Sequence, residues 1–163
     1  MSGDPTEIRV SVADYAVSDN ALISTIGLGS CVAIVLHDAM ARVGGMAHVL
    51  LPNVSMSRDR SNPAKFPETA VPLLLDEMRR LGARRDRVSA KIVGGASMFA
   101  ALIPAGGINI GERNIVAARD ALDAAGVPIV AEDVGSDYGR SVYLSTQDGR
   151  VEVRSLRKGL RVL

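Results

Sequence analysis

The chain has 163 residues, a formal net charge of +1 and a single cysteine. This length suits one domain, residues 1–163, with a substantial core. The near-balance of charge excludes a strong electrostatic attraction to nucleic acid, and no stretch approaches the ~20 apolar residues of a membrane span. The lone cysteine and the lack of a secretory signal at the N-terminus predict a cytoplasmic protein.

The first third of the chain predicts strands. Residues 8–18 alternate apolar and polar side chains and are expected to form a first strand. Residues 31–38, "CVAIVLHD", are continuously apolar, which is typical of a central strand. Residues 42–52 follow after a short turn and predict its antiparallel partner. Residues 53–66 are polar and predict a loop.

A helix is expected over residues 67–83, ending at Gly82. The predicted apolar face consists of Leu74, Met78 and Leu81. If Thr69 is the N-cap, Pro72 falls in the first turn, where its missing N–H costs nothing; otherwise Pro72 kinks the helix.

The second half predicts further helices and strands. Residues 89–103 are interpreted as a strand, a glycine turn and a short helix, and residues 127–135 as a strand. Residues 109–126 predict a helix that begins with a capping box of Asn109 and Glu112 and ends at Gly126. Residues 140–156 predict a hairpin. Together these elements indicate an α+β layered sandwich with a mixed, largely antiparallel sheet and about three helices.

The spacing of Cys31 and His48 permits a prediction of strand register. If Ala39 and Met40 form the tip of a tight turn, Cys31 lies directly opposite His48 on neighbouring strands. Directly opposed Cβ atoms are about 4.5–5.5 Å apart, so the sulfur and the imidazole would meet. A bulge at the glycines of "VGGM" would change this register.

A cysteine beside an imidazole is a potential nucleophile with its base, and Thr25 and Ser30 are the nearby hydroxyls that could orient the ring. Simple packing of a buried cysteine and histidine is the competing interpretation. A zinc site is the other competitor, but His37 lies six residues beyond Cys31 on one strand, about 20 Å away. No metal site is therefore expected.

Five motifs, "GLGSCVAIVLHD", "GGMAHVLLP", "AKIVGGASMF", "NIGERN" and "EDVGSDYGR", resemble in order the chemoreceptor glutamine deamidase family, CheD. The resemblance covers about residues 8–153. It implies that the catalytic cysteine, histidine and threonine of the family correspond to Cys31, His48 and Thr25. It also implies a layered fold like that of deamidating bacterial toxins.

The resemblance further implies an amidohydrolase that acts on glutamine side chains of the cytoplasmic helices of methyl-accepting chemotaxis proteins, and, in some lineages, binding to the CheC phosphatase. The chain departs from the family pattern at Val93, Ser136 and Leu144, where packing and a turn are affected.

The residues support a mechanism in which the Cys31 thiolate attacks the amide carbonyl and forms a thioester, with His48 moving the protons. Backbone N–H groups near Gly29 and Ser30, including that of Cys31, are the candidate oxyanion donors. No cofactor is required. The rival interpretation is a non-catalytic adaptor that binds receptors or the phosphatase, and a second enzymatic rival is acyl transfer to an amine.

Overall fold

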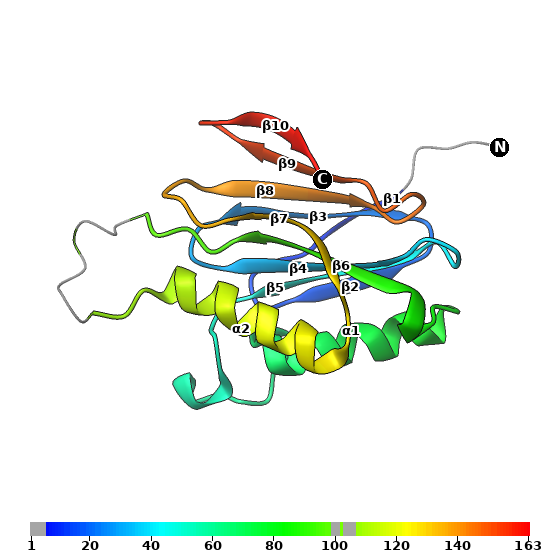
Figure 1. Cartoon of the computed structure of the whole chain (residues 1–163), viewed down its shortest axis with the longest axis horizontal. Coiled ribbons are helices and arrows are strands. Elements are labelled where there is room, and N and C mark those ends of the chain that lie inside the picture. Colours follow the sequence, from blue (N-terminus) through cyan, green and yellow to red (C-terminus); the bar gives the residue numbers. More distant parts are fainter. Residues whose placement is uncertain (1–5, 99–101, 103–106) are drawn as a thin grey trace.

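The computed structural model describes residues 6–98, 102 and 107–163. In this part of the chain ten strands form two five-stranded sheets, accompanied by two α-helices (Figure 1). The first sheet has the order β1 (Thr6–Arg9), β3 (Ala21–Leu28), β8 (Arg140–Ser145), β9 (Val151–Ser155) and β10 (Gly159–Val162). The second sheet has the order β2 (Tyr15–Ser18), β5 (Val43–Val49), β4 (Val32–Asp38), β6 (Val88–Gly94) and β7 (Ile129–Val134). The helices are α1 (Pro67–Arg80) and α2 (Ile110–Ala125).

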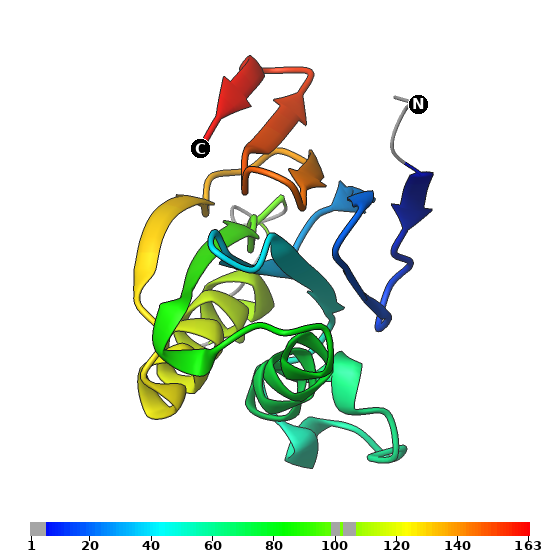
Figure 2. The ribbon, with the colours of Figure 1, turned by 90° about the vertical axis from the view of Figure 1, so that its right-hand side faces the viewer.

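The elements form three layers (Figure 2). Both helices cover one face of the second sheet, and the first sheet packs against its other face. Strand β4 lies in the middle layer, so side chains on both of its faces are buried, with Ile34 toward the helices and Val35 toward the other sheet. Only the pairs β1–β3 and β6–β7 are parallel within the described sheets. The predicted α+β sandwich is confirmed, with two mixed, largely antiparallel sheets in place of the one expected and two α-helices against about three.

The N-terminal segment differs from the prediction. Residues 8–18 do not form one strand, because the chain turns after β1 and enters the other sheet as β2. Ala13 has a positive φ of 60° in this turn, and the Asp14 amide donates to the Ser11 carbonyl. The alternation of polarity holds only from Ile8 to Val12 and changes phase at Ala13, so the sequence carries a signal of the break that the prediction of one strand overlooked. Strands β3 and β10 were not predicted either.

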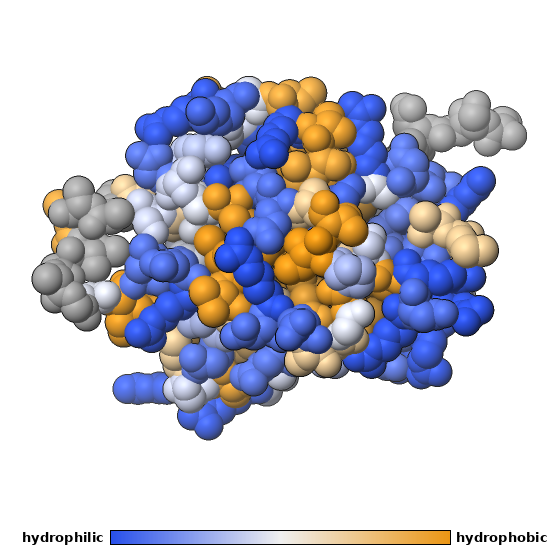
Figure 3. All heavy atoms as spheres, in the orientation of Figure 1, coloured by the Kyte–Doolittle hydropathy of each residue, from blue (hydrophilic) through white to orange (hydrophobic). Residues whose placement is uncertain are grey.

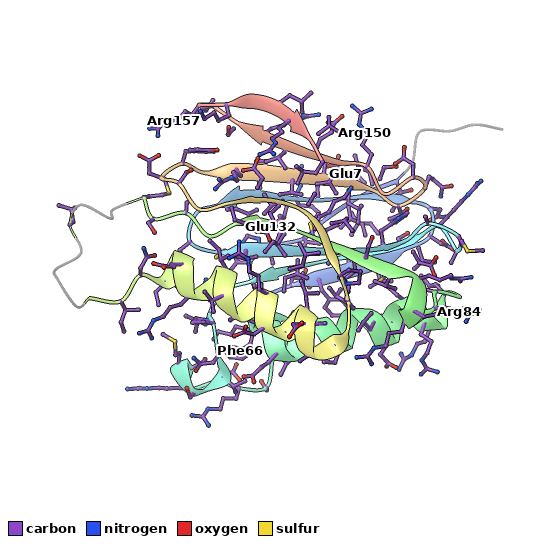
Figure 4. All side chains as sticks on the ribbon, viewed as in Figure 1. Glu7, Phe66, Arg84, Glu132, Arg150 and Arg157 are labelled. Carbon is purple, nitrogen blue, oxygen red and sulfur yellow. The ribbon has the colours of Figure 1, made fainter. Side chains whose placement is uncertain are left out.

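Helix α1 starts at the first residue of the predicted range and ends at Arg80, before Gly82. Phe66, labelled in Figure 4, is the N-cap, and Pro67 takes the first helical position, where its fixed φ is compatible with a helix. Thr69 therefore lies inside the helix and is not its N-cap, and Pro72 lies beyond the first turn. Leu81 follows the last helical residue and is 43% exposed, so it does not belong to the buried face.

Helix α2 has the predicted bounds and the Asn109 half of the predicted capping box, whereas no hydrogen bond from the Asn109 amide to the Glu112 side chain is found between these two described residues. The Asn109 side chain accepts a hydrogen bond from the Glu112 amide at 3.1 Å, and Gly126 ends the helix in the left-handed conformation. Residues 53–66 form a loop that contains two short 3₁₀ turns, η1 (Val54–Met56) and η2 (Pro63–Lys65). The short helix expected before residue 103 falls mostly on 99–101 and 103, outside the described residues.

The three departures from the family pattern lie where packing or a turn is affected. Val93 and Leu144 are fully buried between the two sheets. Ser136 adopts a positive φ of 59° in the turn after β7. The differences at Val93 and Leu144 are thus accommodated in the core.

Strand β7 forms one edge of the second sheet. Its Glu132 points toward α2 and pairs with Arg119 (Figure 4), whereas its Val130 is exposed. The face of the molecule seen in Figure 3 mixes apolar and charged side chains. Among the described residues, no helix is long and apolar enough to cross a membrane.

Candidate active site

The three predicted site residues come together at one end of the space between the sheets. Thr25 lies on β3 in the first sheet, His48 lies on β5 in the second, and Cys31 directly precedes β4. Thr25 is fully buried, His48 is 1% exposed and Cys31 is 9% exposed. The site therefore depends on the packing of the two sheets against each other.

The predicted register of β4 and β5 is wrong by two residues. His48 lies opposite Ala33, and the pairing continues without a bulge to Asp38 opposite Val43. The connection is therefore a four-residue loop, Ala39–Arg42, and not a two-residue turn.

The buried Asp38 carboxylate accounts for the longer loop. One oxygen accepts from the amides of Met40 and Ala41 at 3.0 and 3.1 Å. The other accepts from the Arg84 amide at 2.9 Å and from Arg87 Nε at 3.1 Å. Arg84 lies beyond α1 (Figure 4). A tighter turn would leave this buried carboxylate without its loop donors.

A shift of two residues preserves the face on which each side chain lies. Cys31 stands two residues before Ala33, so it is a diagonal neighbour of His48 on the face between the sheets. Diagonal neighbours on adjacent strands are about 7–8 Å apart, within reach of long and aromatic side chains. Although both residues are described, no hydrogen bond joins the Cys31 thiol to the His48 ring. The two side chains, expected from the sequence to meet, are thus not joined by a hydrogen bond.

Thr25 fixes the tautomer of His48. The Thr25 hydroxyl donates its only proton to the Val10 carbonyl at 2.7 Å. The same oxygen lies 2.7 Å from His48 Nδ1, and it must accept there because its proton is already used. Nδ1 therefore carries the hydrogen, and Nε2 of the neutral ring has a free lone pair. Nε2 is buried and has no hydrogen-bond partner among the described residues.

Burial keeps both groups neutral at rest. It lowers the pKa of His48 from 6.5 to about 4, since the imidazolium is poorly solvated between the sheets. Burial also raises the pKa of the Cys31 thiol, and the N–H of the same residue opposes this only in part. The resting pair is thus a thiol and a neutral imidazole, not a thiolate and an imidazolium.

The loop before Cys31 is held by the glycine-rich motif "GGAS". The Gly95 amide donates to the Cys31 carbonyl and the Ala96 amide to the Gly29 carbonyl, each at 2.8 Å. At Gly94, φ is +110° and a Cβ would lie 2.4 Å from the Cys31 carbonyl oxygen. Only glycine permits this approach, so the motif supports the backbone of Cys31.

Carbonyl groups of this loop are anchored, whereas its predicted oxyanion donors are free. The amides of Ser30 and Cys31 donate no hydrogen bond to another described residue. The Cβ position of Gly29 is 3.3 Å from the sulfur of Met98, so a side chain there would press on that neighbour. Gly29 and Ser30 therefore belong to a compact backbone segment beside Cys31 in which the amides of Ser30 and Cys31 donate to no other described residue.

Two contributors to the site were not identified from the sequence. The Val10 carbonyl orients Thr25, and a backbone group gives no signal in a sequence. Asn114 is fully buried and its side chain donates to the Ser30 carbonyl at 2.9 Å. A polar residue on the apolar face of α2 was the signal available for Asn114. Among the described residues no group of three or more His, Cys, Asp or Glu side chains is placed to hold a metal ion.

The chain matches known proteins along nearly its whole length. Residues 50–155 match the model of the family described as CheD chemotactic sensory transduction. A protein of Caldanaerobacter subterraneus subsp. tengcongensis is 42% identical over 157 residues, which covers 96% of this chain and 97% of that protein. A protein of Pyrococcus abyssi is 45% identical over 154 residues, 94% of each chain. Both relatives carry the name "Probable chemoreceptor glutamine deamidase CheD". The chain belongs to the CheD family.

Proposed function

We propose that this protein is a cysteine-dependent amidohydrolase that converts glutamine side chains of chemoreceptors to glutamate with release of ammonia. The observation that carries the proposal is the fixed tautomer of His48, whose unpartnered Nε2 lies on the same face as Cys31. The names of the relatives supply the substrate class. Because these glutamines lie on the cytoplasmic helices of receptors, we also propose a cytoplasmic location.

In the first half of the reaction, the Cys31 sulfur attacks the side-chain carbonyl carbon as His48 Nε2 takes the thiol proton. The carbonyl oxygen becomes an oxyanion, and the free amides of Ser30 and Cys31 are its candidate donors. When the tetrahedral species collapses, the C–N bond breaks and the imidazolium returns its proton to the departing ammonia. A thioester remains on Cys31.

In the second half, a water molecule attacks the thioester carbonyl and His48 takes one of its protons. The C–S bond then breaks, glutamate is released and the sulfur recovers its proton. The low pKa of His48, about 4, makes the transient imidazolium a strong acid that readily protonates the leaving nitrogen, whereas it opposes the earlier transfer of the thiol proton to the ring. Thr25 keeps Nδ1 protonated through both halves, so the same nitrogen, Nε2, moves every proton.

The experiment is mass spectrometry of a receptor cytoplasmic fragment incubated with the protein. Each converted glutamine gains about one mass unit, and one ammonia appears for each conversion. Cys31→Ala should remain folded and inactive. Binding of the fragment without a mass change would favour the adaptor interpretation, and incorporation of an added amine would indicate acyl transfer. Full activity of Cys31→Ala would overturn the proposal.

A CheC-type phosphatase is a second proposed partner, on the basis of the family resemblance alone. Its binding is tested by size-exclusion chromatography of the two purified proteins, and its effect by the deamidation rate at rising phosphatase concentration. If the two proteins do not co-elute and the deamidation rate does not change, the phosphatase is excluded as a partner. The deamidase proposal would be unaffected by that result.

A further inference from the structure

Asn114 joins the two strand ends that carry Cys31 and His48. It belongs to α2, and its Nδ2 donates to the Ser30 carbonyl at 2.9 Å and to the Leu50 carbonyl at 3.1 Å. Ser30 immediately precedes Cys31, and Leu50 follows His48 by two residues. One side-chain amide thus connects the chain segments on which the proposed nucleophile and base are mounted.

The orientation of the Asn114 amide follows from its surroundings. Both neighbours are carbonyl oxygens, which only accept, so the NH₂ group and not Oδ1 must face them. Oδ1 is buried and has no hydrogen-bond partner among the described residues. An unpaired buried acceptor opposes folding, so Asn114 is a costly choice on a face otherwise formed by small and apolar residues such as Ile115 and Ala118. The two hydrogen bonds that Asn114 donates, to the carbonyls of Ser30 and Leu50, offset this cost.

The bond to Ser30 has a consequence for Cys31. The Ser30 carbonyl and the Cys31 N–H belong to one planar trans peptide unit, in which the two groups point in opposite directions. A hydrogen bond that holds the carbonyl toward α2 therefore directs the N–H away from it. The carbonyls on either side, of Gly29 and Cys31, are held by backbone amides. Asn114 supplies the side-chain anchor for the peptide unit that contains the candidate oxyanion donor.

We infer that Asn114 is a positioning residue that aims the Cys31 N–H at the developing oxyanion and holds the end of the His48 strand beside it. The inference rests on the proposed function, because it assigns Asn114 a part in stabilising the tetrahedral species formed by attack of Cys31. Asn114 acts through the peptide group of Cys31 and does not itself touch the substrate.

Two reactions of the Cys31 thiol can show whether Asn114 orients the Cys31 N–H or only stabilises the fold. Acylation of Cys31 by p-nitrophenyl acetate passes through an oxyanion, whereas alkylation by iodoacetamide displaces iodide and forms none. Asn114→Leu keeps the approximate size of the side chain and removes both donors. We expect acylation to slow by about 10- to 100-fold and alkylation to change by less than about threefold, with both rates measured by intact mass.

Gly126→Ala is the matched control. It strains the left-handed C-cap of the same helix, where φ is +72° and no other atom lies within 4 Å of the added Cβ, so it destabilises α2 far from Cys31. Both of its thiol reactions should keep wild-type rates. If Asn114→Leu does not fold, Asn114→Ala leaves room for water beside the two carbonyls, and we expect the same selective loss at about tenfold.

The outcomes distinguish this inference from the proposed function. Equal losses of acylation and alkylation in the Asn114 variants, or no loss of acylation, would overturn the aiming role. A wild-type protein that converts no receptor glutamine would overturn the deamidase proposal. Even then, a selective loss of acylation in the Asn114 variants, relative to the wild type, would still support the role of Asn114 toward Cys31.

Discussion

The two histidines of the chain lie between the same two sheets, on adjacent strands, yet in opposite situations. His37 on β4 is buried, and its Nε2 donates to the Thr146 carbonyl at 2.8 Å. His48 on β5 donates through Nδ1 to Thr25 and leaves Nε2 without a partner among the described residues. An acceptor thus fixes the tautomer of each ring, and the two tautomers are opposite.

The space around each ring also differs. Gly149 approaches His37 so closely that a Cβ there would lie 2.5 Å from Nδ1. The free nitrogen of His48 instead belongs to the face that carries Cys31. Burial alone therefore does not distinguish a structural histidine from a base. The distinguishing feature is which nitrogen is occupied and which chemical group the other nitrogen can serve.

The largest expected effect is on turnover, and it should separate the two histidines. His48→Asn retains a donor near the position of Nδ1 but has no base at Nε2, so we expect deamidation to fall by at least about 10³-fold. His37→Gln retains a donor near the position of Nε2 and should keep activity within about threefold. Ammonia release from a receptor fragment measures both. Equal losses in the two variants would remove the distinction.

The next effect is on stability in acid. Above pH 6.5 His48 is neutral in both the folded and the unfolded chain and contributes no pH dependence. As the pH falls from 6.5 to about 4, the unfolded chain binds a proton at this histidine and the folded chain does not. The free energy of unfolding therefore falls by about 1.4 kcal/mol per pH unit, up to roughly 3 kcal/mol.

His48→Asn abolishes this contribution, and His37→Gln retains it. Urea unfolding at pH 7, 5.5 and 4.5 gives the free energy of unfolding as a function of pH for the wild type and the two variants. The wild-type curve should decline more steeply than that of His48→Asn between pH 6.5 and 4.5. Parallel curves for these two proteins would show that His48 is not held neutral.

A smaller effect is expected at the hydroxyl that fixes the His48 tautomer. Thr25→Val keeps the shape of the side chain but loses the oxygen, so the ring is free to adopt the other tautomer, and turnover should fall by about 10- to 100-fold. Thr25→Ser keeps the oxygen and should lose less. Steady-state kinetics measures the two rates, and ¹⁵N NMR of the ring reports the tautomer. Equal rates for Val and Ser would rule out orientation through this oxygen.

The smallest effect belongs to the packing around His37. Gly149→Ala forces a Cβ against the ring at a φ of +76°, and we expect a loss of about 1–2 kcal/mol in the free energy of unfolding with unchanged turnover. Gly159→Ala is the matched control, because its φ is +68° and no other atom lies within 4 Å of the added Cβ. Denaturant unfolding compares the two. A similar loss in both would show that contact with His37 contributes nothing.

Much of the fold could be predicted because it depends on local signals. The continuous apolar run of β4 predicts a strand with two covered faces, and α2 carries its own start and stop signals in Asn109 and Gly126. The break between β1 and β2 was overlooked, although the alternation of polarity ends at the adjacent apolar residues Val12 and Ala13, where φ of Ala13 is positive. The N-cap of α1 was left open, because both Pro67 and Thr69 are acceptable near a helix N-terminus.

The sequence by itself determined the candidate residues of the site. Cys31 and His48 follow from their chemistry and strand positions, and Thr25 as the orienting group follows from the family resemblance. A register error of two residues left Cys31 and His48 on one face, because side chains alternate with a period of two. The catalytic roles of these residues stay predictions, as do the oxyanion donors near Gly29 and Ser30.

Only the tertiary structure decided how these residues are connected. The register depends on Asp38, whose donor Arg84 is 46 residues away. The tautomer of His48 depends on the carbonyl of Val10, and the peptide unit of Cys31 depends on Asn114, 84 residues from the carbonyl of Ser30 that it binds. Hydrogen bonds act over about 3 Å whatever the separation along the chain, so partners this distant in sequence become visible only when the sheets and α2 are packed together.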